Sequence, residues 1–199
     1  MIRELEYFNI EGAIGWNQNW FRDLSMYFGG CAAVTVCDLC IYMARQKGIK
    51  SLYPFNANSL SKGDYIAFSK IIKKYLGPRL RGVDTLELYI SGLLNYWHEI
   101  GCDSLNAESI SGTVPWTESK NLIKKQIDSG MIVPFLLLNH KNRTMKNYQW
   151  HWFNLAGYKE DQGEFLVKAV TYGSFHWLNL QELWDTGYNR KGGIICIKR

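Results

Sequence analysis

The hydrophobic period changes near Gly130, and this change constrains the fold more than any other feature of the sequence. Before Gly130, apolar residues recur every three to four positions, which is typical of amphipathic helices. After it, short apolar runs alternate with polar turns, which is typical of antiparallel strands joined by short loops. We therefore predict an α+β fold, with an N-terminal helical lobe over about residues 16–130 and a C-terminal antiparallel sheet lobe over about residues 131–199.

The positions of the individual elements follow from apolar spacing, from capping patterns and from turn residues. At 199 residues the chain is long enough to form one domain with a substantial core. The helices are expected over residues 31–48, 62–76, 84–101 and 116–129, the strands over 131–139, 150–158, 164–170, 175–179 and 194–198, and a short helix over 180–184.

Charge and cysteine content exclude several classes of protein. Lys and Arg number 23 against 18 Asp and Glu, and the resulting net charge of +5 is spread along the chain, so a nucleic-acid partner is not expected. The start MIRELEYFNI lacks a signal-peptide pattern and no apolar run is long enough to span a bilayer, so we expect a cytoplasmic protein without a membrane partner. Five cysteines are an odd number, which argues against a disulfide framework.

Cys31 is the candidate nucleophile, because it lies in the first turn of the first predicted helix. A helix N-terminus favours the thiolate through partial positive charge and free N–H groups. Gly29 and Gly30 allow a tight turn beside it, and the Cys31 N–H can donate to an oxyanion. The alternative is that Cys31 is a packing residue like Cys37 and Cys40. These three cysteines lack the second ligand cluster of a zinc site, so we predict no metal.

His151 is the candidate base, because it opens a predicted strand and can project from a sheet end into a cleft. The other three histidines, His98, His140 and His176, are more easily surface or packing residues. Partly buried structural histidines are common, so the pairing with Cys31 decides in favour of His151.

The sequence resembles the papain-like cysteine peptidases, and within them the bacterial families related to the double-glycine leader peptidases. The resemblance rests on Gln18, on the stretch 29–33 (GGCAA), on the strand 151–158 (HWFNLAGY), on 165–168 (FLVK) and on the Tyr172-Gly173 pair. It implies one papain-like catalytic domain over residues 1–199, whose helical lobe opens with the cysteine and whose sheet lobe bears the histidine. It also implies no cofactor.

The resemblance assigns two further roles. Gln18 would supply a side-chain N–H to the oxyanion hole, and because it precedes Cys31 by more than the usual short gap, Asn17 or Asn19 are alternatives. The residue that orients the histidine is usually an Asp or Asn, and Thr171 is the nearest polar residue at that place. Its hydroxyl can accept from the imidazole. The alternative for Thr171 is an ordinary β-branched strand residue.

These residues predict a cysteine peptidase or amide hydrolase that acts on a peptide or another acyl substrate through a thioester. Two alternatives remain open. One is an acyltransferase that passes the same thioester to an amine or alcohol, and the other is a non-catalytic peptide-binding domain that kept the fold and the groove.

Overall fold

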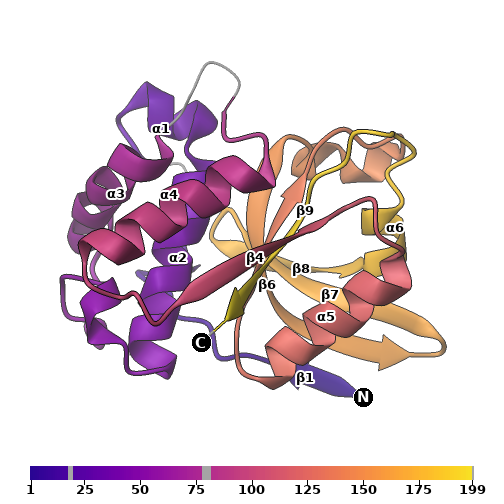
Figure 1. Ribbon diagram of the computed structural model, residues 1–199, viewed down its shortest axis with the longest axis horizontal. Helices are drawn as coiled ribbons and strands as arrows, with labels where there is room; N and C mark the ends of the chain where they lie inside the picture. The colour runs from indigo at the N-terminus through magenta and orange to yellow at the C-terminus, as the bar shows by residue number, and fades with distance from the viewer. Residues whose placement is uncertain (18–19, 78–81, 199) are drawn as a thin grey trace.

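The computed structural model describes residues 1–17, 20–77 and 82–198, and it combines a group of helices with a large antiparallel sheet (Figure 1). The helices of the first half lie on one side and the sheet on the other. The predicted α+β class is therefore confirmed.

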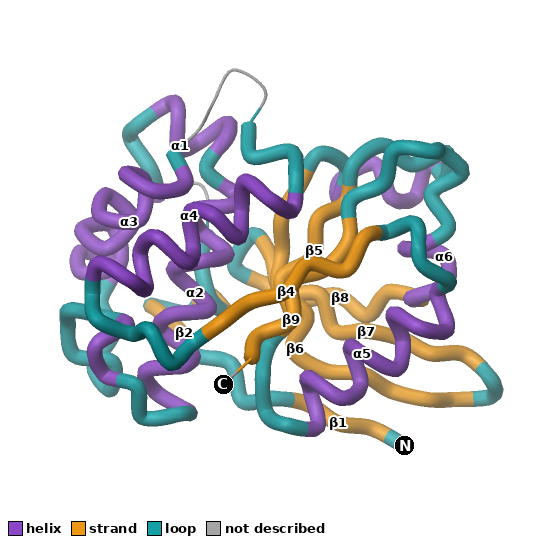
Figure 2. The backbone as a smooth tube through the Cα atoms, viewed as in Figure 1, coloured by secondary structure: helices purple, strands orange, loops and turns teal. Residues whose placement is uncertain are grey.

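The helical side is built around α2, which runs from Cys31 to Gln46 and is buried from Ala32 to Ala44 (Figure 2). The helix α3 packs on α2, and α4 packs on α3. Apolar side chains on nearly every face of α2 explain its central place. The other elements on this side are α1 (Leu24–Gly29), the short 3-10 helix η2 (Lys50–Leu52), α3 (Lys62–Leu76) and α4 (Leu86–Glu99).

Within the described residues, seven strands form one sheet in the order β4-β9-β5-β6-β7-β8, with β1 paired to β6. All of its strand pairs are antiparallel. A separate hairpin is formed by β2 (Asn9–Ile10) and β3 (Ala13–Ile14). The sheet consists of β1 (Ile2–Glu4), β4 (Asn106–Ser111), β5 (Val133–Leu137), β6 (His151–Asp161), β7 (Glu164–Thr171), β8 (Ser174–Asn179) and β9 (Gly193–Lys198), and it is accompanied by α5 (Trp116–Asp128), η3 (Arg143–Tyr148) and α6 (Leu180–Trp184).

The sheet side begins earlier in the chain than predicted. The strand β4 pairs with β9, and α5 packs against β1, β5, β6 and β9, so residues 106–128 belong with the sheet. The predicted boundary near Gly130 missed this because β4 (NAESIS) is largely polar and α5 still has a helical period. A smaller correction concerns α4, which is capped by Thr85 instead of Asp84, through its hydroxyl and the Leu88 N–H.

The strand β6 links the two sides. Its first residue, His151, pairs with Leu137 at the end of β5, and α2 packs against β6. Further along, Gly157 pairs with Glu4 of β1, where a Cβ would lie 2.8 Å from the Arg3 carbonyl oxygen. This arrangement puts the start of β6 beside the N-terminal part of α2.

The segment before α1 lies against both sides. After β1 pairs with β6, the Tyr7 hydroxyl donates to Asp38 of α2, and the Ile14 N–H donates to the Gly173 carbonyl at the turn between β7 and β8. In the part of the chain that the structure describes, no helix is long and apolar enough to cross a membrane.

Candidate active site

Cys31 is held at the junction of two helices by Gly30. The Gly30 N–H donates to the Met26 carbonyl and ends α1, while the Gly30 carbonyl accepts from the Val34 N–H and starts α2. A Cβ at Gly30 would lie 2.5 Å from the Met26 carbonyl oxygen. Only glycine fits there without moving backbone, so Gly30 determines where Cys31 emerges.

The Cys31 side chain is partly exposed, whereas the other four cysteines are buried. Burial of the sulfur raises the pKa of the Cys31 thiol above its ordinary value. Backbone N–H groups of Trp152, Ala32 and Cys31 itself lie near the sulfur and lower the pKa by less than burial raises it. The resting thiol is therefore neutral, in contrast to the thiolate that its helix position suggests.

His151 is buried with a fixed ring orientation. Its Nε2 atom lies 2.7 Å from the Thr171 hydroxyl, and its ring stacks on Tyr172 with the planes 3° apart and the centroids 4.7 Å apart. Only 7% of the residue is exposed. This burial lowers the pKa of His151 from 6.5 to about 4, so the imidazole is neutral near pH 7.

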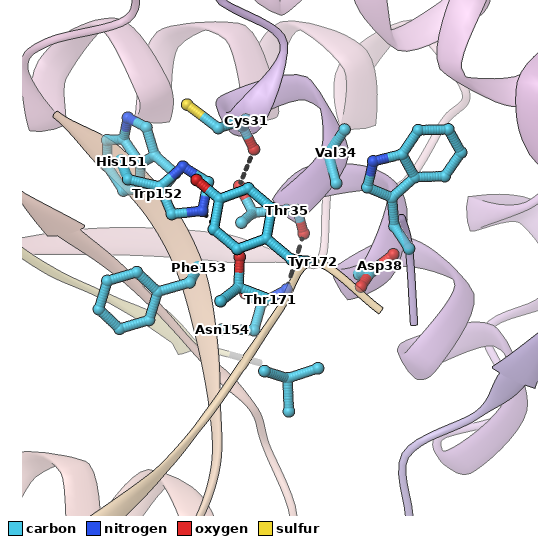
Figure 3. Close-up of a pocket in the computed structure, with 12 residues that line it drawn as sticks. Cys31, Val34, Thr35, Asp38, His151, Trp152, Phe153, Asn154, Thr171 and Tyr172 are labelled. Carbon is cyan, nitrogen blue, oxygen red and sulfur yellow. Dashed lines mark hydrogen bonds between the residues drawn. The ribbon is translucent and has the colours of Figure 1, made fainter. Parts of the chain in front are cut away.

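Cys31 and His151 line the same small pocket, together with Thr171 and Tyr172. Figure 3 shows the Cys31 side chain close to the His151 ring, with Tyr172 in front of that ring. Cys31 comes from the helical side, whereas the other three come from the ends of β6 and β7. The pocket thus lies where the two sides of the molecule meet.

Tyr172 occupies a strained backbone position. With Gly173 it forms the turn between β7 and β8, where the φ angles are 52° and 75°. Such hairpin turns favour Asn, Asp or Gly, and a bulky residue at positive φ is uncommon. The Tyr172 side chain is 46% exposed while it covers His151. Strained residues of this kind concentrate at functional sites.

Asp38, one of the residues that line the pocket, carries a buried polar network beneath it. Its carboxyl group accepts from the Tyr65 hydroxyl at 2.6 Å and from the Tyr7 hydroxyl at 2.9 Å. Burial raises the pKa of Asp38 from 3.8 to about 7, in spite of these donors. The sequence holds no signal for this network, because Asp38 lies inside a predicted helix and its partners come from distant segments.

Two side chains of β6 fasten the strand to the helical side. Asn154 donates from Nδ2 to the Thr35 carbonyl of α2 at 3.2 Å. Trp152 donates from Nε1 to the Val83 carbonyl at 2.6 Å and stacks on Tyr89. These contacts hold the strand that carries His151 against the helix that carries Cys31.

The structure brings three of the four predicted site residues together, namely Cys31, His151 and Thr171. The fourth, Gln18, lies outside the described residues, as does its alternative Asn19. The other alternative, Asn17, is described, and its side chain lies against Gly173.

The remaining histidines have structural partners away from the pocket. His98 pairs with Asp103 on the surface, His140 is 2.8 Å from the Glu182 carbonyl, and His176 is an exposed strand residue. Within residues 1–17, 20–77 and 82–198, no three His, Cys, Asp or Glu side chains are grouped so as to hold a metal ion.

No protein-family model matches the chain, and a search of curated proteins finds no match.

Proposed function

We propose that this protein is a papain-like cysteine hydrolase in which Cys31 is the nucleophile and His151 its base. One observation carries the proposal: His151 shares a pocket with Cys31, while its Nε2 atom is 2.7 Å from the Thr171 hydroxyl. With the proton on Nε2 and donated to Thr171, the Nδ1 lone pair is free to accept the thiol proton. Nucleophile, base and orienting residue then occupy the roles that thioester chemistry needs.

The reaction starts from a neutral pair, because burial raises the pKa of Cys31 and lowers that of His151. As the sulfur attacks the substrate carbonyl carbon, Nδ1 of His151 takes the thiol proton and the C=O π electrons move to the oxygen. Collapse of this oxyanion expels the amine or alcohol, which takes the proton from His151. Water then hydrolyses the thioester and restores the thiol. The N–H groups near the sulfur are the candidate donors to the oxyanion.

The neutral orienting residue limits which acyl groups react quickly. Thr171 holds the imidazole but gives the imidazolium no opposite charge, unlike an Asp. Esters and thioesters, which have good leaving groups, are therefore expected to react faster than peptide amides. A peptide remains the default physiological substrate.

Acyl transfer to an amine or alcohol is the second candidate. Tyr172 covers His151, which is 7% exposed, so water has limited access to the base that would activate it. Product analysis with a p-nitrophenyl ester and a competing amine separates the two reactions. Acylated amine in excess of free acid supports transfer, and free acid alone supports hydrolysis.

The hydrolase proposal is tested with p-nitrophenyl ester turnover and iodoacetamide labelling of the native protein. Because the other four cysteines are buried, labelling of the folded wild type should occur at Cys31 alone. The Cys31→Ala variant should lose both turnover and labelling while it stays folded by circular dichroism. Retained turnover in this variant would overturn the proposal.

The non-catalytic alternative predicts a different result. His151→Gln should slow wild-type turnover by at least about 100-fold if His151 is the base. If instead the wild type shows no turnover and its thiol reacts no faster than that of His151→Gln, the pocket is a binding site without chemistry. The raised pKa of the Cys31 thiol is the observation that makes this outcome worth testing.

A further inference from the structure

A second pocket lies between α3 and the segment 20–26, away from Cys31 and His151. Its cavity volume is about 380 Å³, a size suited to a small ligand. Its apolar and aromatic lining comes from Trp20, Phe21, Met26 and Ile66. An apolar chain would therefore be removed from water in this pocket.

The polar lining of the same pocket is strongly basic. Arg22, Lys62, Lys70 and Lys73 line it, and the one lining carboxylate, Asp23, is already paired with Lys73. Arg22, Lys62 and Lys70 form no ion pair within the part of the chain that the structure describes. Three cations that lack an ion-pair partner and share one concave surface focus a positive potential into it.

The helical repeat of α3 explains how apolar and basic groups come to share one pocket. Lys62, Ile66, Lys70 and Lys73 are spaced by three or four residues and form one stripe of the helix. The opposite stripe, which includes Phe68, is buried in the core. The Lys62 ammonium group lies 5.4 Å from the centroid of the Trp20 ring. Within this stripe Lys73 is paired with Asp23, and the Lys62 backbone N–H donates to the Glu11 carboxylate at 3.4 Å.

We propose that this pocket binds a single amphipathic anion, with its phosphate or carboxylate group among Arg22, Lys62 and Lys70 and its apolar chain against Phe21, Met26 and Ile66. The charge complementarity selects an anion, and the buried apolar surface selects one that carries a hydrocarbon portion. An inorganic anion satisfies only the first requirement.

A discrete ligand fits better than a membrane surface. The cations and the apolar groups line one pocket between α3 and the segment 20–26, so a single ligand can contact both kinds of group. The exposed apolar residues of α1, Leu24 at 71% and Phe28 at 78%, do not line it. A bilayer would instead have to contact those residues.

The pocket is a neighbour of the Cys31 site but not part of it. Phe21 packs on the Trp16 ring at a centroid distance of 4.1 Å, and Trp16 lines the pocket of Cys31 and His151. Neither Cys31 nor His151 lines the basic pocket. Binding there can therefore be measured in a protein that lacks the Cys31 thiol.

Isothermal titration calorimetry with octyl phosphate, below its critical micelle concentration, tests the proposal. One molecule should bind per chain, at least about tenfold more tightly than octanol, octyltrimethylammonium or inorganic phosphate. Arg22→Gln and Lys70→Gln should each weaken binding by about fivefold, as expected for a partly exposed ion pair. Ile66→Ser should weaken it by about tenfold through lost apolar contact.

Lys74→Gln is the matched control, because Lys74 is an exposed lysine of the same helix that does not line the pocket. It should leave binding unchanged, and so should Cys31→Ala, which separates this test from that of the proposed function. Equal binding of octyltrimethylammonium, or an equal effect of Lys74→Gln and Lys70→Gln, would refute the proposal. So would co-sedimentation with phosphatidylglycerol vesicles in the absence of octyl phosphate binding.

Discussion

The side chains of Cys31 and His151 are held in place in different ways. Cys31 is partly exposed, and its place depends on the backbone fit of Gly30 against Met26. His151 is enclosed, and its place depends on side-chain contacts with Thr171 and Tyr172. We therefore expect backbone displacement to disturb the part of the site on α2, and the loss of side-chain contacts to disturb the part on β6.

The largest expected difference between these two parts of the site is in pH dependence. Burial raises the pKa of Asp38, on the helix of Cys31, from 3.8 to about 7, so Asp38 contributes stability at low pH that is lost as the pH rises through 7. Burial lowers the pKa of His151 from 6.5 to about 4, so His151 contributes stability above pH 6.5 that is lost as the pH falls through 4. The two slopes oppose each other in the wild type.

Two variants should separate these two pH dependences of the unfolding free energy, measured by urea denaturation at a series of pH values. In His151→Gln the free energy of unfolding should fall by roughly 4 kcal/mol as the pH rises from about 4 to about 7. In Asp38→Asn it should instead fall by roughly 3 kcal/mol as the pH is lowered from 6.5 to about 4. Slopes of the same sign in the two variants would contradict this account.

Gly30→Ala should disturb the start of α2, where Cys31 lies. The new Cβ would meet the Met26 carbonyl oxygen at 2.5 Å, and relief requires movement of α1 or of the Cys31 backbone. We expect a loss of about 3 kcal/mol in unfolding free energy and a changed rate of Cys31 alkylation. Gly63→Ala is the control, since the nearest atom there is the Ser61 hydroxyl at 3.8 Å. If both variants behave alike, Gly30 has no special role.

Thr171→Val should remove the contact that orients the His151 ring, with a smaller loss of unfolding free energy. The buried His151 Nε2–H loses its acceptor, which costs about 2 kcal/mol of unfolding free energy and should lower ester turnover. Thr171→Ser, which keeps a hydroxyl, should behave almost like the wild type. Thr171→Asp should raise the pKa of His151, measured by its NMR titration. An unchanged rate in Thr171→Val would show that the hydroxyl does not orient the base.

The smallest expected effect is on unfolding free energy, when the same substitution is made in the two similar turns at the ends of β7. Gln162-Gly163 and Tyr172-Gly173 both have two consecutive positive φ angles. Gln162→Asn should stabilise its turn by up to about 1 kcal/mol, because Asn tolerates this backbone better. Tyr172→Asn should relieve the same backbone strain, but it also removes the stacking on His151, so we expect no net stabilisation. Because His151 becomes more exposed, its pKa should rise toward 6.5. Equal stabilisation by both variants would mean that Tyr172 does not cover the base.

Those elements of the fold that have a strong hydrophobic period could be predicted from the sequence. The helices α3 and α6 have the predicted bounds, and α2 begins at Cys31 as expected. The strands β1 and β4 were missed because they are short and exposed or largely polar, and they form only by pairing with β6 and β9. Strand pairing across such separations leaves no local pattern.

In the candidate site, too, some features could be predicted from the sequence and others could not. Cys31 and His151 were identifiable as candidates from their places at an element start, and Thr171 lies within hydrogen-bond distance of His151. The cover by Tyr172 and the network of Asp38 depend on side chains that meet only in the folded chain. The neutral state of the pair follows from burial, which a helix N-terminus alone does not reveal.

The contacts of the N-terminal segment have a consequence for the order of folding. Ile2 pairs with Lys159, and the Ile14 N–H donates to the Gly173 carbonyl. These N-terminal residues therefore form their contacts with residues more than 150 positions later in the chain. Closing such long loops is entropically costly and slows folding. During synthesis the helices can form early, but the turn that presents Tyr172 to His151 can be fastened only after the ribosome has delivered β6, β7 and β8.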